Sequence, residues 1–301
     1  MLRLYKNQKS KINYLNTDSA FMKETNEKTW SVLLFNKSVL KQRKYQEITD
    51  LLGDTSNLYC LDIGSDNGVI SYLLRDRGGS WKSADLDEQA VQSIRQLVKD
   101  DVFQINGLST PFQDNEFDTV VIVDFLEHIA TDREFINELF RVIKPGGELI
   151  INVPHIKNIA LRKLRLAIGQ TDEKHGHLRP GYTAKQLTEM LGDRFTVTAH
   201  KSYSKFFSEF IDTTINLGLS IVKKGEGNTQ KGQIVTEKDI SKYQKMFKAY
   251  SAIYPIFWVM SKLDTLLFWR SGYMLIVKAK INKQPIITPK SQNTSSLVSL
   301  N

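Results

Sequence analysis

The sequence has little cysteine and no long hydrophobic run. Cys60 is the single cysteine among 301 residues, which excludes an internal disulfide framework and favours a reducing compartment. Cys60 lies in an apolar run, where we expect a small buried core residue. No charge-free apolar stretch reaches the roughly 18 residues that a transmembrane helix needs, and the N-terminus lacks the apolar segment of a secretory signal. We therefore expect a cytoplasmic chain.

The overall composition is that of a globular protein with a basic charge balance. Hydrophobic residues make up 41% and charged residues 25%, which excludes a collagen-like or disordered chain. The 41 Lys and Arg residues outnumber the 33 Asp and Glu residues, for a formal net charge of +8. Such an excess favours anionic partners, either nucleic acid or an acidic membrane surface.

Short apolar runs alternate with amphipathic stretches along most of the chain. The alternation predicts an α/β fold in which a doubly wound, mostly parallel sheet has helices on both faces. A helical pattern from Asp18 or Ser19 to Gly53 predicts a helical cover before the sheet, and a later helix from Thr183 to Leu191 is expected to begin at a Thr183 cap. The predicted strands are Leu58–Ile63, Trp81–Leu86, Val102–Asn106, Phe117–Phe125, Glu148–Val153, Phe195–Tyr203 and Tyr273–Ile281.

The same patterns divide the chain into five parts. Residues 1–56 form an N-terminal arm and helical cover, and residues 57–205 form the main sheet core. Residues 206–270 are a helical insertion rich in aromatic and basic residues, and residues 271–282 return to the core as its last strand. Residues 283–301 are a tail rich in Ser, Thr, Asn and Pro, which we expect to be disordered.

A glycine turn follows the first predicted strand. Residues 61–68 read Leu-Asp-Ile-Gly-Ser-Asp-Asn-Gly and lead into a predicted helix. Glycines let the backbone pass close to a ligand, and helix N-terminal amides attract anionic groups. The spacing Gly-x-x-x-Gly disfavours NAD, whose fingerprint is Gly-x-Gly-x-x-Gly. At the end of the next strand, Asp85 is suited to accept both hydroxyls of a ribose, although a solvated carboxylate fits that position equally well.

A longer series of motifs follows in a fixed order. It runs from Gln104–Gly107 through Glu116–Val121 and Asp124–Ile129 to Lys144–Gly147, which precedes a predicted strand. This order and spacing resembles class I S-adenosylmethionine-dependent methyltransferases, particularly the type of ubiquinone and menaquinone biosynthesis. The resemblance covers about residues 57–200. It implies a Rossmann-like core and S-adenosyl-L-methionine as the cofactor.

The resemblance also implies which residues form the turn at the cofactor. Asp62, Gly64, Ser65 and Gly68 would lie under its methionine part. Asp66 occupies the position of the family's usual second glycine. A side chain at this position can crowd the cofactor, or its charge can face the cofactor's ammonium or sulfonium group.

The rest of the implied cofactor site follows the later strands. Asp85 would hold the ribose, with Leu86 against the adenine. Asn106, next to Gly107, stands where the family often has an aspartate that accepts a hydrogen bond from the adenine amine, and an amide oxygen can accept the same bond. Asp124 would lie near the methionine end.

A methyltransferase that acts on a hydroxyl benefits from a general base, and histidine is the default residue type. His128 follows the fourth strand at the ligand-binding edge of the sheet, and we select it as the catalytic residue, with a structural hydrogen bond as the alternative. Asp124, Glu127 and His128 have helical spacing, so one helix face can present all three to Mg²⁺. The same pattern is common in the family without a metal, and we therefore predict no metal site.

The insertion combines positive charge with aromatic residues. Residues 201–270 hold 11 basic, 6 acidic and 12 aromatic residues. Its second helical stretch carries aromatics at helical spacing with lysines on the other side, which is typical of a helix at a membrane interface. Packing on the sheet, a lid or a dimer contact remain open as alternatives. The aromatics are Tyr243, Phe247, Tyr250, Tyr254 and Trp258.

The combined prediction is a methyltransferase that acts on a hydroxyl of an amphiphilic, lipid-linked or glycan acceptor, with peripheral contact at the inner face of an anionic membrane. A soluble enzyme for a small-molecule metabolite, with the insertion as a lid, is the first alternative. A non-catalytic cofactor-binding module is the second. Nucleic acid is not expected as a partner, because the aromatics line apolar helices rather than a basic groove. The oligomeric state stays open.

Overall fold

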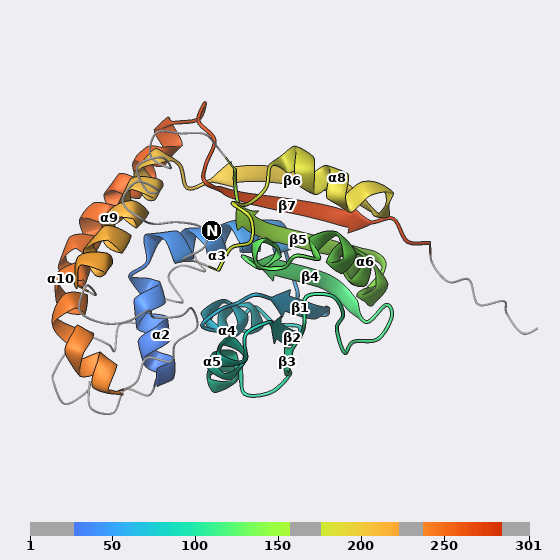
Figure 1. The fold of residues 1–301 in the computed structure, drawn as a ribbon, viewed down its shortest axis with the longest axis horizontal. Coiled ribbons are helices and arrows are strands. Elements are labelled where there is room, and N and C mark those ends of the chain that lie inside the picture. Colours follow the sequence, from blue (N-terminus) through green and yellow to red (C-terminus); the bar gives the residue numbers. More distant parts are fainter. Residues whose placement is uncertain (1–26, 157–175, 223–236, 285–301) are drawn as a thin grey trace, which may run out of the picture.

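The computed structural model describes residues 27–156, 176–222 and 237–284. A seven-stranded sheet with the strand order β3-β2-β1-β4-β5-β7-β6 runs through its centre (Figure 1). Strands β1 to β5 are parallel where they pair, and β7 runs antiparallel to both β5 and β6. The strands are β1 Tyr59–Ile63, β2 Ser80–Asp85, β3 Val102–Gln104, β4 Phe117–Val123, β5 Ile143–Pro154, β6 Phe195–Tyr203 and β7 Met274–Ile281.

The predicted doubly wound fold is confirmed, and each predicted strand is present. β5 starts earlier than the predicted Glu148, because Ile143 already pairs with Phe117 of β4, and the Lys144–Gly147 turn forms an irregularity between this pair and the Thr119–Glu148 pair. Thr183 caps its helix as expected, since its hydroxyl accepts from the Gln186 backbone N–H. The predicted arm at 1–19, the start of the first helix, His175, the loop at 223–233 and tail residues 285–301 lie outside the described residues.

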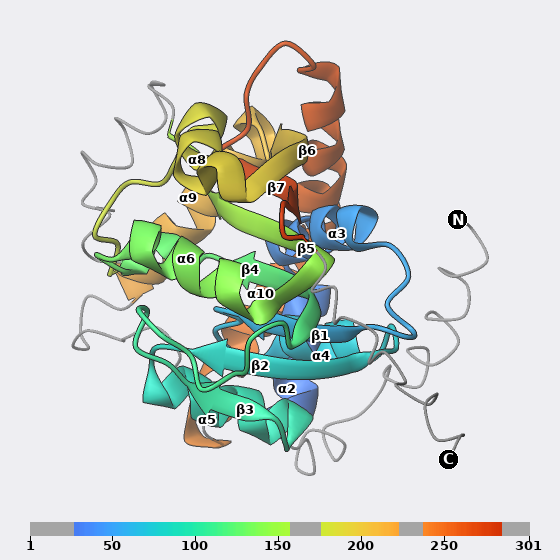
Figure 2. The same ribbon diagram turned by 90° about the vertical axis from the view of Figure 1, so that its right-hand side faces the viewer.

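Helices cover both faces of the sheet (Figure 2). One face packs against α6 and α8, and the other against α3 and α4, with α5 beside α4. The described helices are α2 Glu27–Asn36, α3 Val39–Leu52, α4 Val69–Arg75, α5 Glu88–Val98, α6 Asp132–Val142, α8 Ala184–Leu191, α9 Phe206–Val222 and α10 Glu237–Lys262, with short 3-10 turns η2 Leu126–His128, η4 Gly192–Arg194 and η5 Leu263–Leu266.

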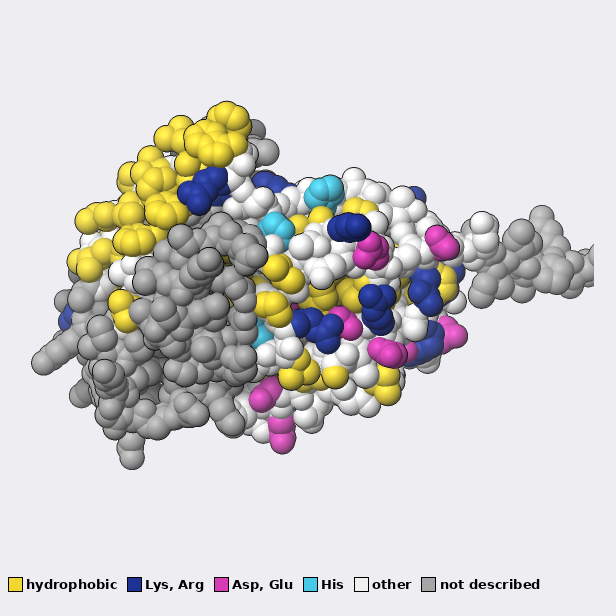
Figure 3. All heavy atoms as spheres, turned by 45° about the horizontal axis from the view of Figure 1, so that its top comes forward, with side chains coloured by type: hydrophobic (Ala, Val, Ile, Leu, Met, Phe, Trp, Pro, Cys, Tyr) yellow, Lys and Arg dark blue, Asp and Glu magenta, His cyan; other side chains and the backbone are white. Residues whose placement is uncertain are grey.

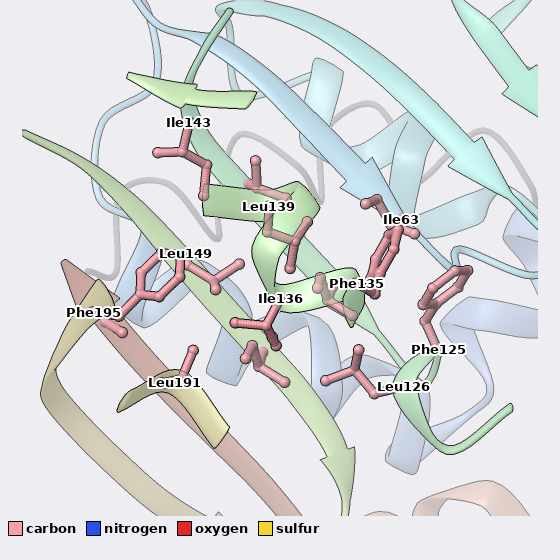
Figure 4. Close-up of a cluster of buried hydrophobic side chains, with 14 of the residues drawn as sticks. Ile63, Phe125, Leu126, Phe135, Ile136, Leu139, Ile143, Leu149, Leu191 and Phe195 are labelled. Atoms are coloured by element: carbon pink, nitrogen blue, oxygen red, sulfur yellow. The ribbon is translucent and has the colours of Figure 1, made fainter. Parts of the chain in front are cut away.

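The larger core lies between the sheet and the α6–α8 layer. Phe135, Ile136 and Leu139 of α6 meet strand residues such as Ile63 and Leu149, and all five side chains are fully buried (Figure 4). Alternate strand residues point to the opposite face, where Cys60 packs with α3 and α4. The expected burial of Cys60 is confirmed, and burial raises the pKa of its thiol to about 12.

The N-terminal helical cover consists of two helices rather than the single one predicted. The chain leaves α2 at Asn36 and re-enters a helix at Val39, and the Ser38 hydroxyl accepts from the Lys41 backbone N–H to cap α3. The apolar periodicity continues across this break, which is why the sequence pattern alone predicted one helix. Gly53 ends α3 as expected.

The helical insertion before the last strand is also confirmed. Helices α9 and α10 lie side by side between β6 and β7 in chain order, and both contact α3 of the cover (Figure 1). Within the described residues, no helix is long and apolar enough to cross a bilayer. The boundaries of the five predicted parts stay a prediction.

The turn after β1 provides a test of packing. A Cβ at Gly64 would lie 2.2 Å from the Val123 carbonyl oxygen, whereas a Cβ at Gly146 would have no neighbour within 4 Å. Both glycines have left-handed φ angles, 87° and 79°, so alanine costs each site about 1 kcal/mol of backbone strain. We expect Gly146→Ala to lower the free energy of unfolding by about 1 kcal/mol and Gly64→Ala by roughly 3 kcal/mol or more. Urea titration measures both, and equal losses would contradict the close approach of β1 and β4.

Candidate functional site

The predicted cofactor residues lie at the carboxyl ends of four adjacent strands. The order β3-β2-β1-β4 places the ends of these parallel strands side by side, and the chain reverses its direction of strand addition between β1 and β4. Ligands of doubly wound folds bind at such a reversal point. Gly64 follows β1 and donates its backbone N–H to the Ala84 carbonyl of β2, while Asp124 follows β4 and donates its own to the Asn152 carbonyl of β5.

Asp62 is fully buried and its carboxylate serves the protein itself. It accepts hydrogen bonds from the hydroxyls of Ser71 and Ser83, the latter at 2.7 Å, and pairs with the Arg75 guanidinium at 3.4 Å. Burial raises its pKa, against the opposing effects of Arg75 and the hydroxyls. Asp62 therefore links β1, β2 and α4 beneath the turn. Its effect on a bound ligand would be indirect, because it fixes the position of the turn.

In the turn after β1, Ser65 and Gly68 are buried, whereas Asp66 is half-buried. The buried Ser65 hydroxyl accepts from the Ser71 backbone N–H at 3.0 Å. Gly68 caps α4 at φ 75°, and a Cβ there would lie 2.7 Å from the Ile94 Cα atom. Asp66 has φ 53°, a left-handed conformation that aspartate adopts more readily than most residues. An aspartate at the usual glycine position thus preserves the turn, and its half-buried carboxylate adds negative charge to the site.

Asp85 ends β2 as a buried carboxylate. Its Oδ1 atom accepts from the Asp87 backbone N–H at 3.2 Å. Burial raises the pKa of Asp85 to about 6; backbone N–H groups oppose this rise and the Asp66 carboxylate adds to it. The ionised side chain is thus under-solvated, which suits a site for ligand hydroxyl donors. Beside it, Leu86 lies against Gly107: its Cδ2 atom is 3.3 Å from where a Gly107 Cβ would stand.

Asn106 uses its amide oxygen locally. The oxygen accepts from the backbone N–H groups of Leu108 and Ser109 at 3.0 and 2.9 Å. This geometry is an Asx-type turn that shapes the loop after β3. A contact to adenine from Asn106 would therefore use its amide N–H donors, or require the oxygen to exchange partners.

Asp124 pairs with a lysine that the sequence analysis did not identify. Lys44 of α3 donates to Asp124 Oδ2, and Asn152 of β5 donates to Oδ1 at 3.0 Å. Burial lowers the pKa of Lys44, but Asp124, with Glu127 and Asp66 farther away, outweighs burial and raises it, so the lysine stays charged. Eighty residues separate Lys44 from Asp124, and no local pattern links them.

His128 lies in η2, immediately after Asp124. Its Nδ1 atom is 2.9 Å from the Gly176 carbonyl oxygen, a contact that requires Nδ1 to carry a proton. In the neutral ring, Nε2 is then the acceptor. The His177 ring meets the His128 ring edge-on at a centroid distance of 4.8 Å. The geometry is therefore compatible with His128 as a base at Nε2.

The helical face proposed for Asp124, Glu127 and His128 is wrong. Asp124 has φ 47°, and only the three residues of η2 form a helical turn, so Asp124 is not part of one helix face. Within the described residues, the group of potential metal ligands is instead Glu127, His128 and His177, whose ligand atoms lie within 4.8 Å of one another. His177 comes from a segment after the fifth strand, a long-range neighbour that spacing within one motif could not reveal.

A hydrogen-bonded segment fixes that neighbour. Leu178 donates its backbone N–H to the Glu127 carbonyl, and Arg179 pairs with Asp132 while donating to the Ile129 carbonyl at 2.8 Å. The buried Tyr182 hydroxyl is placed to donate to the Asp132 carboxylate at 2.8 Å and to the Leu126 carbonyl at 3.0 Å. The segment is thus held rigidly against η2.

The other two described histidines lie in structural positions. His155 Nδ1 is 2.9 Å from the Gly272 carbonyl oxygen, which links β5 to the turn before β7. His200 lies exposed on β6. His128, which follows β4 beside Asp124, remains the candidate base.

Residues 61–151 match the family of methyltransferase domains. The matched segment contains Asp62, the glycine turn, Asp85, Asn106, Asp124 and His128. This segment is a class I S-adenosylmethionine-dependent methyltransferase domain. The resemblance found in the sequence is thereby confirmed, at low identity to the known relatives.

The methyltransferase domain has curated relatives in quinone biosynthesis. It is 27% identical over 111 residues to a ubiquinone biosynthesis O-methyltransferase of Rickettsia canadensis, which covers 36% of this chain and 47% of that protein. It is 33% identical over 95 residues to a demethylmenaquinone methyltransferase of Clavibacter sepedonicus, covering 30% of this chain and 39% of that protein. The chain thus spans less than half the length of these relatives.

Solved structures share the fold at low identity. The crystal structure of the [4+2]-cyclase SpnF superposes with a TM-score of 0.51 and 17% identity, covering 80% of this chain and 81% of that one. This likeness concerns the fold alone, because one fold serves many reactions.

The residues of the methyltransferase domain fit the predicted cofactor. Asp85 offers a buried acceptor for ribose hydroxyls, and Leu86 with Gly107 offers an apolar surface next to it. Asp66 and Asp124 are carboxylates that would complement positive ammonium and sulfonium groups, and Lys44, which pairs with Asp124, is a cation that would attract a carboxylate. S-adenosylmethionine carries all of these groups, so the donor set and the cofactor agree.

The burial of Asp85 predicts a pH-dependent gain of stability on neutralisation. A carboxyl with a pKa near 6 instead of 3.8 destabilises the folded state by up to about 3 kcal/mol above pH 6. The penalty is absent below the unfolded value and builds as the pH rises between the two. We therefore expect Asp85→Asn to raise the free energy of unfolding by about 1–2 kcal/mol near pH 7 and to lose that advantage towards pH 4. Urea titration across this range tests it, and a pH-independent effect would contradict it.

Proposed function

We propose that this protein transfers a methyl group from S-adenosylmethionine to a hydroxyl of an amphiphilic, lipid-linked or glycan acceptor. The observation that carries the proposal is the coincidence of the methyltransferase-domain match with the convergence of the glycine turn, Asp85 and Asp124 at adjoining strand ends. Relatives named for ubiquinone and menaquinone biosynthesis support a lipid-like acceptor, and one is named as an O-methyltransferase.

The chain's own residues would position the reactants. S-adenosylmethionine, when bound, supplies a methyl carbon activated by a positive sulfonium for in-line displacement. Asp85 would accept the ribose hydroxyls, and Asp66 and Asp124 would complement positive charge, while Asp62 fixes the turn from below. Holding two reactants in line is worth up to roughly 7–11 kcal/mol, so positioning supplies most of the catalysis expected here.

His128 would remove the proton of the acceptor hydroxyl. Its Nδ1–H donates to the Gly176 carbonyl, and Nε2, which lies 4.0 Å from the buried Glu127 carboxylate, would take the proton. Lys44 is unsuited to this task, because the Asp124 carboxylate holds it in the charged form. The proposed proton path therefore begins at the acceptor hydroxyl and ends on His128 Nε2.

The tautomer of His128 can be measured without knowing the acceptor. Long-range ¹H–¹⁵N spectra of the neutral ring should show the proton on Nδ1 of His128, as also expected for His155, which makes the same kind of contact. The exposed His200 serves as the contrasting ring. With an acceptor in hand, His128→Gln should lower kcat by roughly 10²–10⁴-fold. A proton on Nε2 of His128 would contradict its role as the base.

Calorimetry tests whether the chain binds S-adenosylmethionine, on which the proposed function depends. We expect micromolar binding of S-adenosylmethionine and S-adenosylhomocysteine to the full chain. Asp85→Ala should weaken both by roughly 10–100-fold, because it removes a charged hydrogen-bond acceptor. Affinity should also fall as the pH drops below about 6, where Asp85 becomes protonated. Absence of binding at millimolar cofactor would overturn the proposed function.

Asp66 separates a working site from a degenerate one, the second alternative. If its carboxylate faces the sulfonium, Asp66→Gly weakens S-adenosylmethionine more than S-adenosylhomocysteine, which lacks that charge. A gain in affinity for both ligands would instead favour a non-catalytic module in which Asp66 crowds the cofactor. The same calorimetric titrations supply both results.

The first alternative, a soluble enzyme for a small metabolite, has one observation in its favour. Tyr250 and Tyr254 of α10 contact the cover, as helices of a lid would: the Tyr250 hydroxyl donates to the Lys37 carbonyl at 2.6 Å, and Gln42 Nε2 donates to the Tyr254 hydroxyl at 3.0 Å. The exposed residues on the opposite face of α10 bear on whether the insertion is a lid or a membrane contact.

A further inference from the structure

Most of the exposed large apolar side chains of the described residues gather at one end of the molecule. Figure 3 shows them as a continuous yellow area over α9, α10 and the turn that follows η5. Phe268 and Trp269 protrude most, with 81% and 68% of their surface exposed. We call this area the apolar face, and it consists of Phe210, Leu217, Ile253, Ile256, Val259, Leu263, Leu266, Phe268 and Trp269.

The two tyrosines and the aliphatic residues of α10 differ in exposure, and Trp258 is exposed like the aliphatic residues. Tyr250 and Tyr254 are half-buried against the cover, whereas Ile253, Ile256 and Val259 point away from it and are exposed. Of the aromatic stripe expected at a membrane interface, Tyr250 and Tyr254 therefore pack against the cover, whereas Trp258 is exposed. The aliphatic stripe on the opposite side remains exposed.

A hydrogen-bonded corner holds the protruding aromatics in place. Both carboxylate oxygens of Asp264 in η5 accept from backbone N–H groups at the start of α9, including Lys205 at 2.8 Å and Phe207 at 2.9 Å. The Lys205 ammonium donates to the Leu267 carbonyl at 2.7 Å, next to Phe268. Phe268 and Trp269 thus lie in an ordered turn between η5 and β7 that is hydrogen-bonded to the start of α9.

The exposed charges of the segment from Lys248 to Gly272, which forms the α10 and η5 part of the apolar face, have one sign, whereas the α9 part contains the half-buried Asp212. From Lys248 to Gly272 the sequence contains a single acidic residue, Asp264, which is buried and occupied with α9. The basic residues of the same segment, Lys248, Lys262 and Arg270, are all exposed. Lys262 lies over the Trp258 ring at 5.0 Å, so positive charge adjoins the apolar surface directly.

We propose that the apolar face docks onto the surface of an anionic lipid bilayer, with Phe268 and Trp269 inserted at the headgroup level. An amphipathic surface of this kind lies in the plane of the interface, and each basic residue near an anionic leaflet adds about 1 kcal/mol of attraction. Aromatic rings at the insertion point and cations at the rim match that environment. The proposal stands independently of methyl transfer.

The charge pattern argues for a bilayer against a second copy of this chain. A two-fold contact through the apolar face would bring Lys262 and Arg270 close to the same cations of the partner copy, with no exposed acid in the segment to pair with them. An anionic membrane offers the opposite charge over its whole surface. Charge complementarity therefore favours an anionic lipid surface over a second copy of this chain.

Vesicle flotation of the full chain tests the docking. We expect binding to vesicles of equal parts phosphatidylcholine and phosphatidylglycerol, and at least about tenfold weaker binding to phosphatidylcholine alone. The double variant Phe268→Ser, Trp269→Ser should reduce binding to the anionic vesicles roughly tenfold or more. Lys262→Glu with Arg270→Glu should remove the preference for anionic lipid.

A matched variant controls for general hydrophobicity. Leu178, 63% exposed, lies in the segment beside η2 and outside the apolar face, so Leu178→Ser should bind vesicles like the unaltered chain. Cofactor calorimetry on the same aromatic variant reports on the methyltransferase site separately. Retained vesicle binding in the aromatic double variant would overturn the proposal. A dimer that dissociates in that variant without lipid would also overturn it, in favour of self-association.

Discussion

The buried Asp62 carboxylate is the interaction on which the arrangement of the site depends. It accepts from Ser71 of α4 and Ser83 of β2 while sitting on β1, and Arg75 pairs with it and also donates to the Trp81 carbonyl at 2.9 Å. A buried carboxylate without such partners would cost several kcal/mol of folding free energy, and these groups offset that cost. The result is a strand–turn–helix unit whose geometry is fixed before any ligand arrives, with Gly64 seated against β4.

The second determinant of the site comes from outside the sheet. Lys44 belongs to α3, and its pairing with Asp124 brings the cover to the carboxyl end of β4. Two residues earlier on the same helix, Gln42 bonds Tyr254 of α10. The insertion, the cover and the methyltransferase domain are therefore joined by a continuous series of contacts through α3. This series explains how the apolar face keeps a defined position relative to the strand ends.

Local patterns predicted the parts of this protein that local physics determines. The alternation of apolar runs gave the strands, and Thr183 with Gln186 gave a helix start, because both depend on neighbours a few residues away. The hydrogen bonds that Asn106 accepts from Leu108 and Ser109 were predictable from its turn-forming sequence. The family resemblance instead implied a hydrogen bond between Asn106 and adenine. The partners Lys44 and His177 were not predictable, since each reaches the site across a long stretch of chain.

The aromatic stripe of α10 divides between the cover, which Tyr250 and Tyr254 contact, and the exposed surface, where Trp258 lies. A tyrosine has a hydroxyl that can be satisfied at a buried contact, and Tyr250 and Tyr254 use theirs against Lys37 and Gln42. Isoleucine and valine have no such group, so the exposed aliphatic stripe gains nothing from water or from polar neighbours. A class I domain supports many reactions on one sheet, as the similarity to a cyclase illustrates. The domain alone therefore does not specify the acceptor, and our proposal of a lipid interface rests on the apolar face that the insertion adds to it.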